Sequence, residues 1–277
     1  MKKVLSIQDI SCVGKCSLTV ALPIISSMGI ECAILPTSLL SNHTAFKSFT
    51  FLDLTNEMKK ILNEFKNQGF EFDSIYSGYL GSKEQIDIII DVAKDFKNES
   101  NYVICDPAMA DYGKLYPGFD MDFANHMFKL CLKADVILPN ITEACLMLGL
   151  EYKEKMSKDD IELIMSEFAK AGVKNVVLTG VSFDDSKLGF AFLDEKRNIK
   201  YHFNDVINAR YHGSGDIFAS TFTGALMNGK DMFTSAVIAS KFVCESLKFT
   251  LKDKNSNWYG LNFEQAIPYL LKDLQNY

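Results

Sequence analysis

The chain has 277 residues, of which 48% are hydrophobic and 23% charged, and its formal net charge is −6. This composition is typical of a single globular domain over residues 1–277 with a large core. The acidic balance, with no Lys/Arg run longer than a pair, argues against a nucleic-acid partner. No apolar run reaches the length that crosses a bilayer, so we expect no membrane partner either.

Seven cysteines are scattered along the chain, mostly inside apolar segments. An odd number in this arrangement is typical of reduced core cysteines in a cytoplasmic protein. The apolar part of the N-terminus is only VLSI, which is too short for a signal peptide and favours a buried first strand.

Short β-type runs alternate with longer helical patterns along most of the chain. Strands are predicted over 3–7, 31–37, 72–78, 102–106, 134–140 and 175–180, and helices over 17–28, 53–69, 82–96, 123–133, 141–150 and 159–172, with Ser82 as the cap of the helix over 82–96. Residues 188–194 and 198–204 predict an antiparallel hairpin, and helices are predicted over 216–229, 233–251 and 263–274. The alternation predicts an α/β fold whose mostly parallel sheet is covered on both faces.

Ligands of open α/β sheets bind beyond the carboxyl ends of the strands, and polar residues gather just there. They are Asp9 and Ser11, 41–44, Gly78 and Tyr79, 106–111, Asn140 and Glu143, Thr179 and Gly180, and 213–216.

The stretch GSGD, residues 213–216, places two glycines and an acid where a helical pattern begins. Flexible glycines let successive backbone amides converge on one anion, and the helix dipole adds positive potential. Asp216 then either complements the helix dipole or acts as a base beside a bound phosphate. Both interpretations stay open at this point.

Two further motifs also carry a structural and a functional interpretation. Asn140 and Glu143 in PNITE fit a capping box, and they also suit a site for hydrated Mg²⁺ near phosphates. In CDPAMAD, residues 105–111, Asp106 and Asp111 fit two interpretations. They either form a turn or belong to an Mg²⁺–phosphate site.

Residues 41–44, SNHT, are turn formers that also supply a dense set of hydrogen-bonding groups, and we assign no base to His43. The chain has no Walker A sequence, protein-kinase signature, nucleophile elbow or GxGxxG fingerprint after its first strand. Any phosphate chemistry must therefore use another kind of phosphate-binding loop.

Taken together and in order, the motifs resemble those of the pyridoxal/pyridoxamine kinases of the ribokinase superfamily. They are IQDISCVG, LLSNHTAF, SGYLGS, DPAMADYGKLYP, ILPNITEA, VVLTG and HGSGDIFAS. The resemblance implies a three-layer αβα sandwich with a mostly parallel central sheet. It also implies ATP-dependent phosphorylation of the 5′-hydroxymethyl of a pyridine vitamer in vitamin B6 salvage, Mg²⁺ with ATP, a monovalent cation such as K⁺, and a homodimer.

The resemblance assigns roles to individual residues, all named here by their positions in this sequence. It implies that Asp216 is the general base and that Gly213, Ser214 and Gly215 form the anion hole. Asp9, Thr44 and Tyr79 are expected to bind the pyridine substrate, and Asp111, Asn140, Glu143 and Thr179 the ATP phosphates. Asp106 and Glu143 are expected at the metal, and the segment around Tyr116 as a flap.

Asp9 departs from the family, in which many members have serine at this position. A carboxylate favours a cationic partner, so we expect pyridoxamine to be used at least as well as pyridoxal. Two alternatives remain: a hydroxymethylpyrimidine kinase of thiamin synthesis, and a non-catalytic vitamin-binding protein.

Overall fold

The computed structural model describes residues 1–209 and 211–277. The chain has a mixed α/β fold with a large, mostly parallel central sheet, as the sequence predicts. It divides into two compact units: a first unit of residues 1–81 and 207–277, and a second unit of residues 82–206. Each unit is described by itself, and the single domain over 1–277 stays a prediction.

The first unit contains strands in the order β4-β1-β2-β3. β1 (Lys3–Ser11) pairs in parallel with β2 (Glu31–Leu40) and β4 (Ser74–Ser77), and the short β3 (Phe51–Asp53) is antiparallel to β2. The predicted first strand, 3–7, is too short, because pairing with β2 resumes at Ile10 after a register irregularity. Asp9 and Ser11 therefore lie inside β1 rather than after it.

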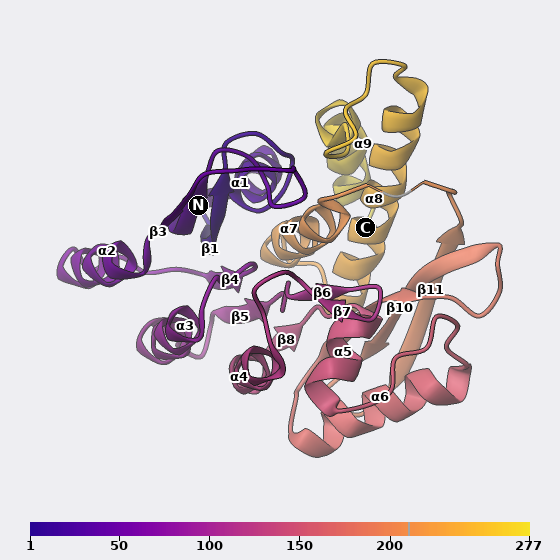
Figure 1. Ribbon diagram of the computed structural model, residues 1–277, viewed down its shortest axis with the longest axis horizontal. Helices are drawn as coiled ribbons and strands as arrows, with labels where there is room; N and C mark the ends of the chain where they lie inside the picture. Colours follow the sequence, from indigo (N-terminus) through magenta and orange to yellow (C-terminus); the bar gives the residue numbers. More distant parts are fainter. Residues whose placement is uncertain (210) are drawn as a thin grey trace. The chain divides into compact units, whose positions relative to one another are not determined.

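The described residues of the first unit contain the helices α1 (Leu18–Ser27), α2 (Thr55–Asn67), α7 (Ser214–Met227), α8 (Met232–Lys252) and α9 (Phe263–Asn276). Figure 1 shows α7, α8 and α9 grouped together at the C-terminal end of the chain. α7 is buried over most of its length, and Gly224 lets α1 approach it. A Cβ atom on Gly224 would lie 2.3 Å from the Met28 sulfur, so a larger residue there would push the two helices apart.

The second unit has strands in the order β11-β10-β9-β8-β5. The parallel strands are β5 (Tyr102–Cys105), β8 (Val136–Ile137) and β9 (Val176–Val181), and β10 (Lys187–Leu193) with β11 (Ile199–Asp205) confirms the predicted hairpin. The strand predicted over 134–140 is wrong in length. Past β8 the regular ladder gives way to an isolated bridge between Asn140 and Thr179, since Pro139 has no N–H to donate.

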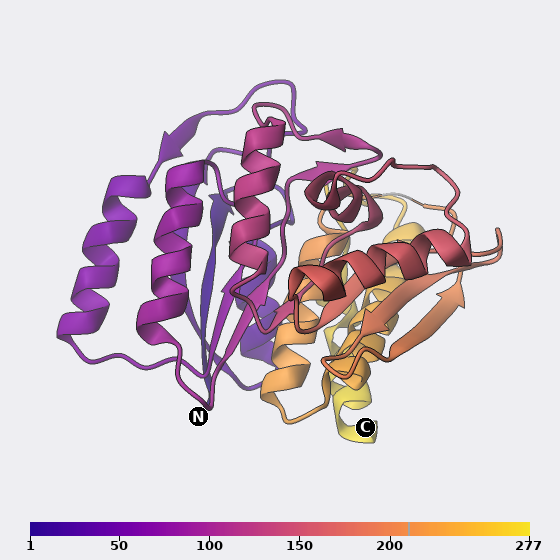
Figure 2. The ribbon, with the colours of Figure 1, turned by 90° about the horizontal axis from the view of Figure 1, so that it is seen from below.

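The second unit also contains α3 (Lys83–Phe96), α4 (Met121–Cys131), α5 (Ile141–Leu148) and α6 (Lys158–Ala171). The predicted cap of α3 is confirmed, because the Ser82 side chain accepts a hydrogen bond from the Gln85 amide. α6 lies along the β10–β11 hairpin (Figure 2). Within residues 1–209 and 211–277, no helix combines the length and the apolar character that a membrane span needs.

Candidate active site

In the first unit, Asp216 lies in the first turn of α7, directly behind the glycine turn. Gly213 is the N-cap of this helix and adopts a left-handed φ of 81°. A Cβ atom on Gly213 would lie 2.0 Å from the carbonyl oxygen of Lys15. Glycine is therefore required at 213 for two reasons, the backbone angle and the close approach of the 12–17 loop.

Gly215 does not adopt the unusual backbone angle that the sequence predicts for it. It lies inside α7, has no positive φ, and has nothing within 4 Å of the place where a Cβ atom would be. The expectation that both glycines need unusual angles is wrong for Gly215, because the helix already begins at Ser214. The open space around Gly215 is its remaining distinctive property.

Asp216 and Asp9 form a pair of neighbouring carboxylates. Burial raises the pKa of Asp216 to about 7, and the negative charge of Asp9 adds to the rise. Asp9 is only 5% exposed, and its Oδ2 accepts a hydrogen bond of 3.0 Å from Ser11 Oγ. Burial also raises the pKa of Asp9, although hydrogen bonds from Ser17 and Ser11 oppose that effect.

Of the other two predicted substrate residues, Tyr79 lies near Asp9. Burial and the charge of Asp9 raise the pKa of Tyr79 to about 12, so the phenol stays protonated and can donate a hydrogen bond. Its backbone carbonyl accepts a bond of 3.3 Å from Thr37 Oγ1. Thr44 is exposed in the loop after β2.

His43, beside Thr44, has backbone partners for both ring nitrogens. Its Nδ1 accepts from the Ala45 amide at 3.2 Å, so Nε2 carries the proton and donates to the Tyr259 carbonyl at 3.0 Å. Burial lowers the pKa of His43, which keeps this neutral tautomer. The ring joins the 41–46 loop to the loop before α9.

In the second unit, Asn140 and Glu143 form the predicted capping box of α5. The Glu143 amide donates to Asn140 Oδ1 and the Asn140 amide to Glu143 Oε2, both at 2.9 Å. Glu143 Oε1 accepts from the Met109 amide at 3.1 Å, so both carboxylate oxygens are engaged by the backbone. Burial raises the pKa of Glu143 to about 7.

The loop predicted after β5 contains a small hairpin that the sequence does not reveal. β6 (Ala110–Asp111) and β7 (Lys114–Leu115) are joined by Tyr112 and Gly113, whose φ values of 50° and 75° fit a type I′ turn. Asn140 Nδ2 donates to the Ala110 carbonyl at 2.8 Å. Asn140 and Glu143 together therefore fix this hairpin to the start of α5.

The remaining predicted residues of the second unit lie near the same hairpin or on β9. Asp106 follows β5 and is 8% exposed, while Asp111 is exposed at the end of β6. Thr179 lies inside β9 rather than after it, and its amide donates to the Pro139 carbonyl at 2.9 Å. In the described ranges 1–209 and 211–277, no group of three or more His, Cys, Asp or Glu side chains could hold a metal ion.

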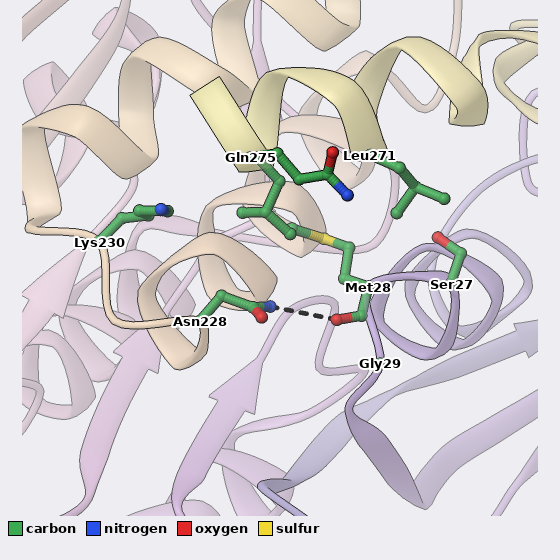
Figure 3. Close-up of a pocket in the computed structure, with 8 residues that line it drawn as sticks. Ser27, Met28, Gly29, Asn228, Lys230, Leu271 and Gln275 are labelled. Atoms are coloured by element: carbon green, nitrogen blue, oxygen red, sulfur yellow. Dashed lines mark hydrogen bonds between the residues drawn. The ribbon is translucent and has the colours of Figure 1, made fainter. Parts of the chain in front are cut away.

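A separate cavity of about 400 Å³ lies at the C-terminal ends of α1, α7 and α9 (Figure 3). Asn228 bridges two of these helix ends, since its Nδ2 donates to the carbonyls of Met28 and Gly224 at 3.2 and 2.9 Å. Asp216 is at the other end of α7, so this cavity is not part of the candidate active site.

No motif in the sequence pointed to Lys15, whose carbonyl oxygen lies against the glycine turn. Ser17 precedes an apolar helical pattern, and that signal indicates a helix cap. Its effect on the pKa of Asp216, which it lowers, had no local signal.

Comparison with known proteins adds the family. Residues 23–258 match the profile described as phosphomethylpyrimidine kinase. This chain belongs to that family. A phosphomethylpyrimidine kinase structure from Bacteroides thetaiotaomicron, crystallised with pyridoxal, is 36% identical and superimposes with a TM-score of 0.92 over 97% of this chain and 95% of its own.

Two pyridoxal kinases are further relatives of this family member. The structure of the enzyme from Lactobacillus plantarum is 28% identical, with a TM-score of 0.91 over 100% of this chain and 99% of its own. The pyridoxal kinase of Dictyostelium discoideum is 29% identical over 80% of this chain and 77% of its own length. The resemblance to pyridoxal kinases of the ribokinase superfamily is thereby confirmed, and the chain is a kinase.

Proposed function

We propose that this kinase transfers the terminal phosphoryl group of ATP to the 5′-hydroxymethyl of pyridoxal and related vitamers, with Asp216 as the general base. The observation that carries this proposal is the position of Asp216, in the first turn of α7 behind left-handed Gly213, with a pKa raised to about 7. The relative that was crystallised with pyridoxal supports the choice of substrate class.

The raised pKa of Asp216 suits its proposed role as the general base. A general base works best when its pKa lies near the working pH, because it is then both deprotonated and basic. Asp216 takes the hydroxyl proton as the substrate oxygen bonds to phosphorus. The amides at 213–215 and the positive end of α7 stabilise charge on the transferring phosphoryl group, which is the main requirement of phosphoryl transfer.

Residues of the second unit would hold the ATP phosphates and Mg²⁺. Carboxylate oxygens are the ligands that Mg²⁺ prefers, and Asp106 and Asp111 supply them. Glu143 fits a direct metal contact poorly, because both of its oxygens already accept backbone hydrogen bonds. We propose that Glu143 supports the 109–116 loop and that it contacts any metal ion through a water molecule. Bound Mg²⁺ would neutralise phosphate charge, and Asn140 and Thr179 would face phosphates and a monovalent cation.

Asp9 is our candidate for vitamer preference. Its carboxylate would favour the ammonium group of pyridoxamine over the aldehyde of pyridoxal by a charge-assisted hydrogen bond. Asp9→Ser should then shift the ratio of kcat/KM toward pyridoxal by about tenfold. Equal ratios in wild type and variant would exclude this role for Asp9.

A coupled assay of ADP release tests the activity. We expect turnover with pyridoxal and pyridoxamine and much less with hydroxymethylpyrimidine. Turnover of hydroxymethylpyrimidine alone would favour the thiamin-pathway alternative, and vitamer binding without turnover would favour the non-catalytic one. Light scattering during gel filtration tests the homodimer that we also propose.

A further inference from the structure

Lys15 joins three segments of the first unit that lie far apart in the sequence. It belongs to the 12–17 loop, between β1 and α1. Its carbonyl oxygen occupies the place where a Cβ atom of Gly213 would be, and its ammonium group reaches the start of α9. One residue therefore connects the loop after β1 with the glycine turn and with the C-terminal helix.

The ammonium group of Lys15 has two oxygen partners at the start of α9. Nζ donates to Asn262 Oδ1 and to Glu264 Oε2, both at 2.9 Å. The side chain of Lys15 is 22% exposed and that of Glu264 is 53% exposed, so the ion pair lies at the edge of the protein. Such ion pairs add little to the stability of a fold. Two acceptors at once nevertheless restrict where the Lys15 side chain can lie.

Asn262 is itself held in place, so it is a firm anchor for Lys15. It is 8% exposed, its amide donates to Thr250 Oγ1 at 2.8 Å, and its Nδ2 donates to Asp253 Oδ2 at 3.0 Å. Thr250 lies in the last turn of α8, and Asp253 is the C-cap of that helix. The end of α8 therefore fixes the oxygen to which Lys15 donates.

The carbon chain of Lys15 packs against a second glycine, in the loop before α9. A Cβ atom on the buried Gly260 would lie 2.5 Å from Lys15 Cβ, far inside normal contact distance. Gly260 has no positive φ, so the close approach of Lys15, and not the backbone angle, requires glycine there. Lys15 thus contacts two glycines, Gly260 and Gly213, and a side chain fits at neither.

We propose that Lys15 is a positioning residue, whose anchored carbonyl sets the glycine turn and so aims the amides of 213–215 at the transferring phosphoryl group. This inference rests on the proposed function of that turn as the anion hole. The Lys15 carbonyl limits how far Gly213 can move toward the 12–17 loop, and the contacts of Nζ keep the carbonyl in place. Amide donors stabilise a transition state well only when they are aimed before the reaction begins.

The first test is Lys15→Met, which removes both hydrogen bonds of Nζ and keeps an unbranched side chain against Gly260. We expect kcat to fall by about tenfold, because small misplacements of groups around the reacting atoms are costly. The Kd for pyridoxal should stay unchanged, since the amides act on the phosphoryl group. Lys2→Met is the matched control, because it removes an ion pair of 2.7 Å with Asp73 at the other end of β1 and should keep kcat.

Glu264→Leu weakens the same anchor from its exposed side, so it gives the answer even if Lys15→Met folds poorly. It should lower kcat by a smaller factor, since Asn262 still accepts from Lys15. If Glu264 acts only through Lys15, the double variant should be no slower than Lys15→Met alone. Losses that multiply in the double variant would contradict this order of contacts.

A nucleotide that mimics the transferring group separates positioning from general damage to the protein. With pyridoxal present, ADP and aluminium fluoride place a planar fluoroaluminate where the phosphoryl group passes. We expect Lys15→Met to weaken the binding of this mixture by about the same factor as kcat, and to leave the Kd for ADP alone unchanged. Equal weakening of both would overturn the inference.

The amide resonance of Gly215 reports the position of the turn without turnover. Nothing lies within 4 Å of the place where a Cβ atom of Gly215 would be, so a shift there reflects movement of the turn itself. Nitrogen-15 glycine labelling should show this resonance moved in Lys15→Met and unmoved in Lys2→Met. A resonance that stays in place in Lys15→Met would overturn the inference, even if kcat falls. An inactive wild type would count against the proposed function alone.

Discussion

Two acids of this chain, Asp216 and Glu143, have pKa values raised to about 7 by burial, but their surroundings differ. Asp216 lies in the first turn of α7, and the residue as a whole is intermediate between buried and exposed. Glu143 is 3% exposed, and the backbone amides of Met109 and Asn140 take both of its oxygens. A raised pKa therefore marks a candidate base only where the carboxylate can also be reached.

Asp216→Asn removes the base with almost no change of shape. We expect a loss of about 10²–10⁴-fold in kcat with the fold retained. Steady-state kinetics measures the loss, and circular dichroism checks the fold. Activity above a tenth of wild type would exclude Asp216 as the base.

Gly213 and Gly215 should respond differently to the same change. Gly213→Ala forces a Cβ atom against the Lys15 carbonyl at a positive φ, so the free energy of unfolding should drop by at least about 1–2 kcal/mol. Gly215→Ala meets open space in α7 and should keep the stability of the protein, as denaturant titration can show. Equal losses in both variants would contradict this distinction.

At the scale of single helices and strands, the sequence predicts features that depend on neighbouring residues and misses those that depend on pairing. Ser82, Asn140 and Glu143 were predicted as caps from residue type and spacing, and the structure confirms them, because capping is a local interaction. The β6–β7 hairpin was missed, since each of its strands has two residues and Tyr112 at the turn gives no glycine-like signal. The extension of β1 was missed too, because it depends on pairing with β2.

The α5 capping box and the β6–β7 hairpin should lose stability together in Glu143→Gln. Glutamine places an N–H against one of the two backbone amides that now donate to the carboxylate, which leaves a buried donor unsatisfied. We expect a loss of about 1–3 kcal/mol in the free energy of unfolding. Asp160→Asn in the exposed capping box of α6 is the matched control and should cost clearly less. Equal losses would show that the contact with Met109 adds nothing.

At the scale of the whole molecule, the predicted site residues fall into two sets. Asp9, Tyr79 and Asp216 belong to the first unit with Thr44 and the glycine turn, whereas the residues assigned to phosphate and metal belong to the second. Strand alternation was enough to predict the α/β fold. The approach of the Lys15 carbonyl to Gly213 was not predictable, because nothing local relates residues so far apart in the chain.

This division predicts separable kinetic effects. Asp106→Asn, in the second unit, should raise the KM for ATP with Mg²⁺ by about tenfold and leave the Kd for pyridoxal unchanged. Titrations of each substrate against the variant give both quantities. Equal loss of affinity for both substrates would contradict the assignment of Asp106 to the phosphate and metal set.

The central claim is tested most directly by identifying the product. Wild-type protein is incubated with ATP, Mg²⁺ and pyridoxal, and phosphorus-31 NMR follows the phosphate groups. We predict one phosphate monoester of pyridoxal for each ADP formed, and almost none with Asp216→Asn. Inorganic phosphate without a vitamer ester, or equal ester formation by Asp216→Asn, would contradict the account.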